Sequence, residues 1–203
     1  MNFVKTLLAS AALAVSFGAS ATVQESLGGG AGSFLSLAST GGIGGGGTLS
    51  GIAGMIVGGT VYSSDQVRAD IPFGTVGNFL ASGPTSGQPA VLTFAPVNYI
   101  SFLWGSPDVE NTLTVTSTVG AAQTFNAGSF GLPTTGDQSF SRYVQFVATA
   151  GQITGLSFNN MPSRDAFEVS NFTITPVPEP ETYALMLAGL GAMAMFARRR
   201  RAE

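Results

Sequence analysis

The sequence contains no cysteine and no histidine, and its only lysine is Lys5. Without cysteine there is no disulfide, no thiolate nucleophile and no cysteine-ligated zinc. Without histidine there is no Ser-His-Asp triad, no histidine-ligated metal and no imidazole base. The lack of any lysine beyond position 5 also argues against P-loop nucleotide hydrolysis and Schiff-base chemistry. Most common kinds of catalytic centre are therefore excluded, and we expect a protein that is not an enzyme.

Charged residues are also scarce, at 9% of 203 residues, against roughly 25% in an ordinary soluble domain. The formal net charge is −3, which argues against a nucleic-acid partner because nucleic acids select basic surfaces. Glycine, in contrast, is abundant, with 28 residues. The chain is long enough to form one domain with a hydrophobic core.

Residues 1–21 have the pattern of a secretory signal peptide. Lys5 provides a positive start, and the run from Leu7 to Val15 is apolar but too short to span a bilayer. Ala19 and Ala21 place small residues at the −3 and −1 positions of a cleavage site. We therefore predict a signal-peptide helix that signal peptidase removes before Thr22, after export by the general secretion machinery. The alternative is an ordinary buried N-terminal helix.

Residues 177–203 form a second distinct segment. Its motif Pro178, Glu179 and Pro180 precedes an apolar run from Tyr183 to Ala197. As a helix of ~1.5 Å per residue, that run is shorter than a hydrocarbon core of ~30 Å, but it can span a bilayer that thins locally. We expect a C-terminal transmembrane helix whose cytoplasmic end is fixed by the basic cluster, which consists of Arg198, Arg199, Arg200 and Arg201.

This tail resembles the PEP-CTERM sorting signal, in which a Pro-Glu-Pro motif, a short transmembrane helix and a basic cluster follow one another. The resemblance implies recognition by an exosortase, a membrane-embedded protease or transpeptidase of Gram-negative bacteria that make exopolysaccharide. It also implies transient insertion in the inner membrane, followed by release or transfer of the body to the cell surface or the extracellular space. A plain single-pass anchor is the alternative, and it would explain the helix and arginines but not the Pro-Glu-Pro motif.

Between the two ends, residues 22–59 form a glycine-rich leader that holds 14 of the 28 glycines. Either this leader is a flexible linker, or its apolar residues pack as loose early strands. We favour partial order from about Thr48 onward. Residues 42–47 formally fit the motif GxGxxG, but neither a strand before it nor a helix after it is expected, so we interpret the match as chance.

Residues 60–176 have the pattern of an all-β domain. Short segments rich in Val, Ile, Thr, Phe and Tyr alternate with Gly, Pro, Ser, Asn and Asp. This pattern predicts a single jelly-roll-like antiparallel β-sandwich. The expected strands are Val61–Tyr62, Val76–Leu80, Ala90–Ala95, Val97–Trp104, Thr112–Thr118, Arg142–Ala148, Ile153–Asn159 and Phe167–Thr175.

Strict alternation in the last of these strands predicts one buried and one solvated face. It places Phe167, Val169 and Asn171 on one face, and Glu168 and Phe172 on the other. Glu168 is then expected on the wet face.

Two segments of this body resemble β-sandwich surface proteins that exosortases process. They are Tyr99–Asp108, with its Gly-Ser-x-Asp ending, and Arg164–Asn171, which is similar to an AFEIDN strand that often precedes the sorting tail. The second segment has Ser170 where an acidic residue is common. The resemblance supports the fold class and implies no chemistry.

Two groups of oxygen-bearing side chains are candidates for a calcium site, because calcium takes six to eight oxygen ligands. Asp108, Glu110 and Asn111 follow one strand, and Asp165 and Glu168 lie where the last strand begins. The favoured alternative is that they are solvated turn residues, and the protein then needs no cofactor. A glycosidase pair of carboxyls is a further, less favoured reading of the same residues.

Five aromatic side chains could form a platform on which sugars stack, but aromatic residues at alternating strand positions are more often core residues. We favour the core, and expect Ile100, Phe102 and Trp104 to share one buried face. The five aromatic residues are Tyr99, Phe102, Trp104, Tyr143 and Phe146.

Taken together, these features predict an exported, non-enzymatic protein of the cell surface or exopolysaccharide matrix, sorted by its C-terminal signal. The alternative is a calcium- or carbohydrate-binding β-sandwich module. In either case exopolysaccharide is a candidate partner.

Overall fold

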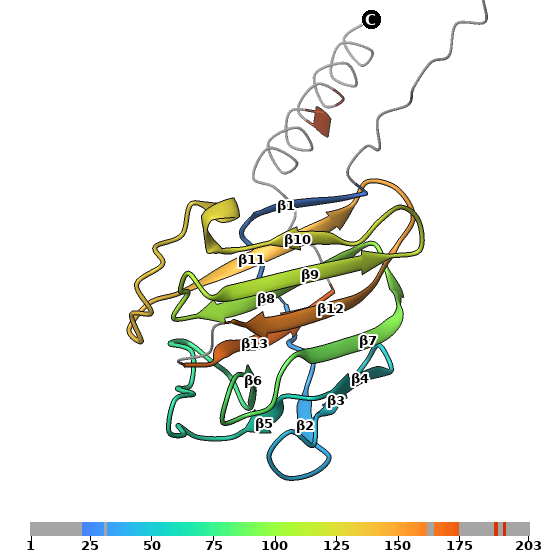
Figure 1. Ribbon diagram of the computed structural model, residues 1–203. Coiled ribbons are helices and arrows are strands. Elements are labelled where there is room, and N and C mark those ends of the chain that lie inside the picture. Colours follow the sequence, from blue (N-terminus) through green and yellow to red (C-terminus); the bar gives the residue numbers. More distant parts are fainter. Residues whose placement is uncertain (1–21, 31, 162–164, 175–188, 191–192, 194–203) are drawn as a thin grey trace, which may run out of the picture.

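The structure, a computed structural model, describes residues 22–30, 32–161, 165–174, 189–190 and 193 (Figure 1). The predicted signal peptide, with Ala19 and Ala21, lies outside the described residues. So do Pro178 to Pro180, the four arginines and most of the predicted C-terminal helix. Within the described part of the chain, no helix is both long enough and apolar enough to cross a membrane.

The described body is all-β, as predicted, and consists of two antiparallel sheets. The six-stranded sheet has the order β1 (Val23–Leu27), β11 (Ser141–Ala148), β8 (Tyr99–Gly105), β13 (Phe167–Thr173), β6 (Phe79–Ser82) and β5 (Thr60–Tyr62). The seven-stranded sheet has the order β10 (Gln123–Phe125), β9 (Asn111–Ser117), β12 (Ile153–Asn160), β7 (Ala90–Val97), β4 (Gly54–Val57), β3 (Gly47–Leu49) and β2 (Leu37–Ser39). A 3-10 turn, η1 (Ala127–Phe130), follows β10.

The two sheets face each other across one apolar core, as in a β-sandwich (Figure 1). Phe102 on β8 meets Phe158 on β12 edge to face, with ring centroids 5.4 Å apart. Trp104 stacks on Phe167 of β13 at 4.5 Å. Ile100, Phe102 and Trp104 are all fully buried in this core, which confirms the shared face expected from their alternation.

The strands from β6 onward cross repeatedly between the sheets. β6, β8, β11 and β13 belong to the six-stranded sheet, and β7, β9, β10 and β12 belong to the other. The central strand orders are therefore β11-β8-β13-β6 in one sheet and β10-β9-β12-β7 in the other. β9 and β10 are consecutive strands, but the other neighbours in these two orders are far apart in sequence, so most of this pairing is long-range.

The glycine-rich segment is part of both sheets, which corrects the expectation of order only from Thr48 onward. β1 pairs with β11, and β2, β3 and β4 extend the seven-stranded sheet beyond β7. Glycine is required where backbones approach closely: a Cβ on Gly46, which has φ +71°, would lie 2.0 Å from the Ile56 carbonyl oxygen. The GxGxxG match leads into strand β3 and not into a helix, as expected for a chance match.

The last strand does not alternate as predicted, because a β-bulge interrupts it. Its register against β8 shifts between Ser170 and Thr173, and Asn171 takes the left-handed φ of +51°. The extra residue turns Phe172 into the core beside Phe167 and Val169. Every residue of β13 is buried, so the strand has no wet face.

Candidate functional site

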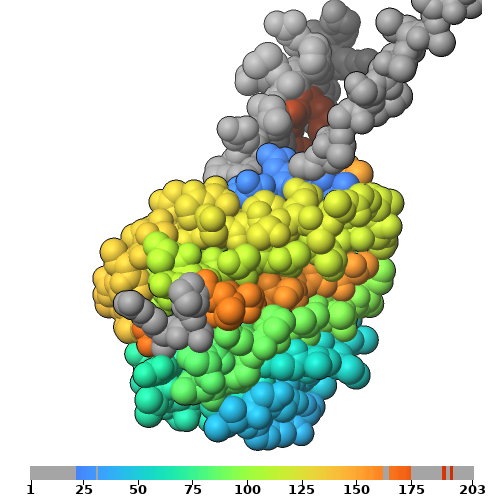
Figure 2. All heavy atoms as spheres, in the orientation of Figure 1, coloured from blue at the N-terminus to red at the C-terminus, as the bar shows by residue number. Residues whose placement is uncertain are grey.

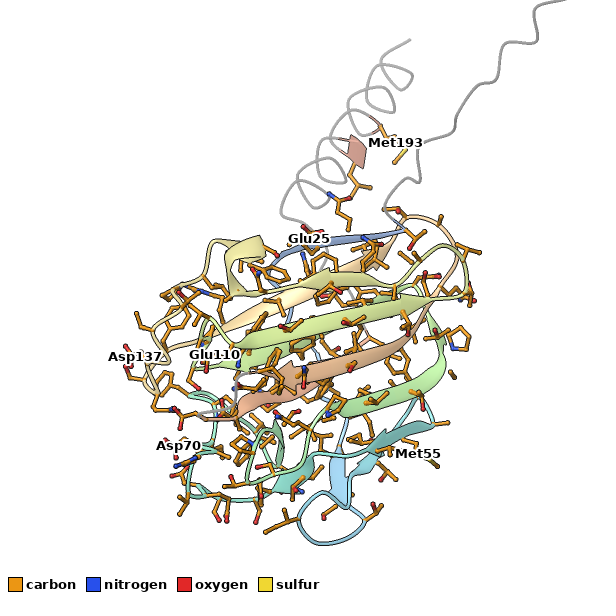
Figure 3. All side chains as sticks on the ribbon, in the orientation of Figure 1. Glu25, Met55, Asp70, Glu110, Asp137 and Met193 are labelled. Carbon is orange, nitrogen blue, oxygen red and sulfur yellow. The ribbon has the colours of Figure 1, made fainter. Side chains whose placement is uncertain are left out.

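The first predicted acidic group is a tight turn between β8 and β9. Asp108 Oδ1 accepts hydrogen bonds from the backbone N–H groups of Glu110 (2.9 Å) and Asn111 (3.0 Å). This pattern is an Asx-type turn, which an aspartate supports by its own side chain. Asp108 therefore stabilises the turn that leads into β9. Glu110, in the same turn, lies at the same end of the molecule as Asp70 and Asp137 (Figure 3).

Asn111 is buried and faces the core. Its Oδ1 accepts from Trp104 Nε1 at 3.1 Å and from the Asp108 backbone N–H at 3.3 Å. Its Nδ2 is buried without a hydrogen-bond partner. The amide oxygen that was a predicted calcium ligand thus accepts a hydrogen bond from Trp104, the only tryptophan in the sequence.

Glu168 is only 1% exposed, so the prediction that it lies on a wet face is wrong. It points away from the core, but residues 63–78 cover this side of the six-stranded sheet. Pro72 packs over Gly105, the β8 residue paired with Glu168: a Cβ added to Gly105 would lie 2.8 Å from the Pro72 ring. Thr75 and Val76 bind the side chains of Ser170 and Asn171 farther along β13.

Glu168 Oε2 accepts a hydrogen bond of 2.8 Å from Ser106 Oγ, and Oε1 is buried without a partner. Burial raises the pKa of Glu168 well above its ordinary value, and the nearby carboxylates of Asp108 and Asp70 raise it further. Burial is also the main reason that the pKa of Asp108 is raised to about 6. Its environment therefore favours the neutral, protonated form of the Glu168 carboxyl group over the charged form.

Asp165 does not join these groups. Its side chain is exposed, and its backbone carbonyl accepts a hydrogen bond of 2.8 Å from Asn160 Nδ2. Within the described residues, no three His, Cys, Asp or Glu side chains are grouped so that they could hold a metal ion. The carboxylates of the predicted calcium set therefore do not assemble into a metal centre.

A shallow depression of about 220 Å³ lies beside the Asp108 turn. Asp108 is the carboxylate among its lining residues, and the backbone of η1 forms another part of the wall. Glycosidase chemistry needs two carboxyls that both reach the sugar. Glu168, the nearest buried acid, is sealed beneath residues 63–78 and cannot reach a substrate without movement of that segment.

The aromatic set divides between the two faces of its sheet. Phe102, Trp104 and Phe146 are fully buried in the core, as favoured above. Tyr99 and Tyr143 lie on the other face, where Tyr99 Oη donates to Gln145 Oε1 (3.0 Å) and Tyr143 stacks on Phe34. The set therefore forms no common sugar-stacking platform.

The exposed face of the seven-stranded sheet is a feature that no sequence motif indicated. None of its seven strands contains a charged residue. Figure 2 shows this side as adjoining bands, with β12 in orange between β7 and β9. Strand pairing aligns side chains in two rows, Thr124-Thr114-Ser157-Val91-Val57 and Thr116-Gly155-Thr93-Met55-Thr48.

The comparisons with known proteins identify the tail and not the body. Residues 176–201 match the family model described as the PEP-CTERM protein-sorting motif, which confirms the resemblance of the C-terminal segment. No curated protein and no solved structure matches the chain. The chain thus carries a sorting motif behind an all-β body of two antiparallel sheets.

Proposed function

We propose that this chain is an exported, non-enzymatic protein of the cell surface or exopolysaccharide matrix, delivered by exosortase processing of its C-terminal signal. The match of residues 176–201 to the PEP-CTERM motif carries the proposal. The predicted N-terminal signal peptide supplies the export step that such processing requires. In this pathway Pro178, Glu179 and Pro180 are recognised by the processing enzyme, and the apolar helix holds the chain transiently in the inner membrane.

The non-enzymatic part of the proposal draws on composition and on the site. The chain has no cysteine or histidine, and the buried Glu168 is separated from solvent. In this proposal the body acts through its surface, either as a structural component of the extracellular matrix or by binding another component of it.

Substitution of Pro178, Glu179 and Pro180 by alanine tests the sorting step. In the native host the variant is expected to accumulate at full length in the inner membrane, while the wild-type chain is released or moved to the surface. Fractionation, immunoblotting and intact mass measure the difference. The matched control replaces the exposed Pro84 and Pro133, which lie in the body. Unchanged release and mass of the motif variant would contradict the proposal.

A carbohydrate-binding module is the second candidate. The orders β11-β8-β13-β6 and β10-β9-β12-β7 favour a jelly roll, an architecture that lectin domains use. The uncharged, hydroxyl-bearing rows on the seven-stranded sheet suit a neutral polysaccharide better than a charged one.

Retention on immobilised polysaccharide tests this second candidate. A panel of neutral glycans, together with exopolysaccharide from the host, is expected to retain the protein, and Ser157→Arg at the centre of one row is expected to release it. Thr135→Arg, an exposed change away from the seven strands, serves as the control. Absence of retention on every glycan would remove the candidate.

A further inference from the structure

Thr22, the residue after the predicted cleavage position, is enclosed by partners from several parts of the chain. It is 9% exposed. Its carbonyl oxygen accepts from the backbone N–H groups of Thr149 (2.9 Å) and Ala150 (3.3 Å). Its Oγ1 lies 3.1 Å from Ser117 Oγ and donates to Gln123 Oε1 at 3.0 Å. With the bond from its backbone nitrogen to Gln123 Oε1, every polar group of Thr22, the residue just before β1, has a partner.

Gln123 makes the central contacts. Its Oε1 also accepts from the backbone nitrogens of Thr22 (2.9 Å) and Val23 (2.8 Å), and its Nε2 donates to the Val23 carbonyl at 3.2 Å. The side chain thus pairs with β1 as a neighbouring strand would. Because β1 and β10 are edge strands of different sheets, Gln123 joins the two sheets at their open edges.

The space around Thr22 is also shaped for a small residue. Gly120 has φ +76°, and a Cβ at this position would lie 2.6 Å from Thr22 Cγ2. The loop after β9 therefore approaches Thr22 as closely as a glycine allows. Ser117, Gly120 and Gln123 therefore surround Thr22, and these three residues are here called the Thr22 socket.

We propose that the Thr22 socket binds the α-ammonium group of the mature N-terminus. The inference rests on the export step of the proposed function, because signal peptidase must cut before Thr22. Cleavage turns an amide nitrogen into an amine that is mostly protonated at neutral pH. Its hydrogen bond to Gln123 Oε1 then becomes charge-assisted, and such bonds are roughly twice as strong as neutral ones. Removal of the signal peptide thereby locks β1 onto the sandwich.

The sequence provides a clean test, because Lys5 is the only lysine and leaves with the signal peptide. The α-amine of Thr22 is then the only primary amine of the exported chain. Intact mass first identifies the mature N-terminus of protein purified from the host. Acetylation with an N-hydroxysuccinimide ester is expected to be slower in the folded protein than in urea by on the order of tenfold or more, the effect of one hydrogen bond to a charged group.

Gln123→Ala is expected to remove this protection, and Gln138→Ala, at an exposed glutamine, is expected to keep it. Gln123→Glu is the second variant, for the case in which the alanine variant fails to fold. It keeps an oxygen for the three contacts that Oε1 accepts, and it loses the donation from Nε2 to the Val23 carbonyl. Because it also places a negative charge beside the ammonium group, it is expected to label at least as slowly as wild type.

Equal labelling of folded and unfolded wild-type protein would overturn the socket, and so would rapid labelling of Gln123→Glu. A mature N-terminus other than Thr22 would overturn it as well. None of these outcomes touches the sorting motif, whose alanine variant reports separately on the proposed function.

Discussion

Glu168 and Ser106 are joined by a hydrogen bond of 2.8 Å from the serine hydroxyl to Oε2, and both side chains are buried. The carboxyl groups that influence Glu168, those of Asp108 and Asp70, disfavour its charged form. Burial, the largest effect, also disfavours the charge on Glu168, whereas the hydrogen bond from Ser106 favours it. The balance raises the pKa of Glu168, and the hydrogen bond ties the start of β13 to the end of β8.

The first prediction concerns the pH dependence of stability. A raised pKa in the folded state means that the contribution of Glu168 is fully present below its unfolded pKa of about 4.3 and is lost as the pH rises toward the folded pKa. The melting temperature of the wild type should therefore fall above about pH 4.3. Glu168→Gln, which mimics the neutral acid, should match wild type near pH 4 and exceed it near pH 8.

Thermal unfolding followed by circular dichroism from pH 4 to pH 8 measures this effect. Asp108, whose pKa is raised to about 6, also lowers the melting temperature as the pH rises. The Glu168→Gln variant retains this contribution, so only the part due to Glu168 is expected to disappear. Glu25→Gln, on edge strand β1, is the control and should leave the profile unchanged. A Glu168→Gln profile parallel to that of the wild type would contradict the assignment.

The second prediction concerns Trp104, which stacks on Phe167 and donates to Asn111. Trp104→Phe removes a buried donor and leaves a cavity, so we expect a loss of about 2–4 kcal/mol in the free energy of unfolding. Urea denaturation monitored by circular dichroism gives the value. Phe73→Leu, at a side chain that is 72% exposed, should change stability by less than about 0.5 kcal/mol. Similar losses for both variants would argue against the buried contacts of Trp104.

The third prediction compares two glycines of the same loop. Gly46→Ala places a Cβ 2.0 Å from the Ile56 carbonyl oxygen, and we expect a loss of more than about 2 kcal/mol or failure to fold. Gly42→Ala meets no atom within 4 Å and should be neutral or slightly stabilising, because alanine restricts the unfolded chain. Equal stability of the two variants in urea would show that this loop does not pack as described.

The fourth prediction concerns the bulge at Asn171. Its Oδ1 accepts from the Val76 N–H, and its Nδ2 donates to Gly74 and Tyr143, each within 2.9 Å. Both Asn171→Ala and Asn171→Gly lose these bonds, but only alanine is strained at φ +51°. We expect the alanine variant to be less stable than the glycine variant by about 1 kcal/mol. The reverse order in thermal unfolding would contradict a left-handed bulge.

Several strands could be predicted because their side chains alternate locally. β7, β8, β9, β11 and β12 lie within a residue or two of the predicted ranges. β1, β2 and β10 were not predicted, and β3 and β4 were covered only by the expectation of partial order from about Thr48 onward. Segments of three to five residues carry too little periodicity to be recognised as strands. Their apolar residues, such as Leu49 and Ile56, are nevertheless buried. The error in β13 has a different cause. One extra residue at Asn171 shifts the register, so the side chains after it point to the opposite face of the sheet from the one predicted.

The sequence by itself determined the sorting tail, the all-β class and the lack of thiol and imidazole chemistry, because these depend on composition and on the local order of residues. Only the tertiary structure decided which polar residues are buried. Glu168 is sealed by residues 63–78, and Gln123 reaches Thr22 from a strand about one hundred positions away. Such contacts depend on which distant segments the sheets bring together, and a single strand's pattern carries no record of its neighbours.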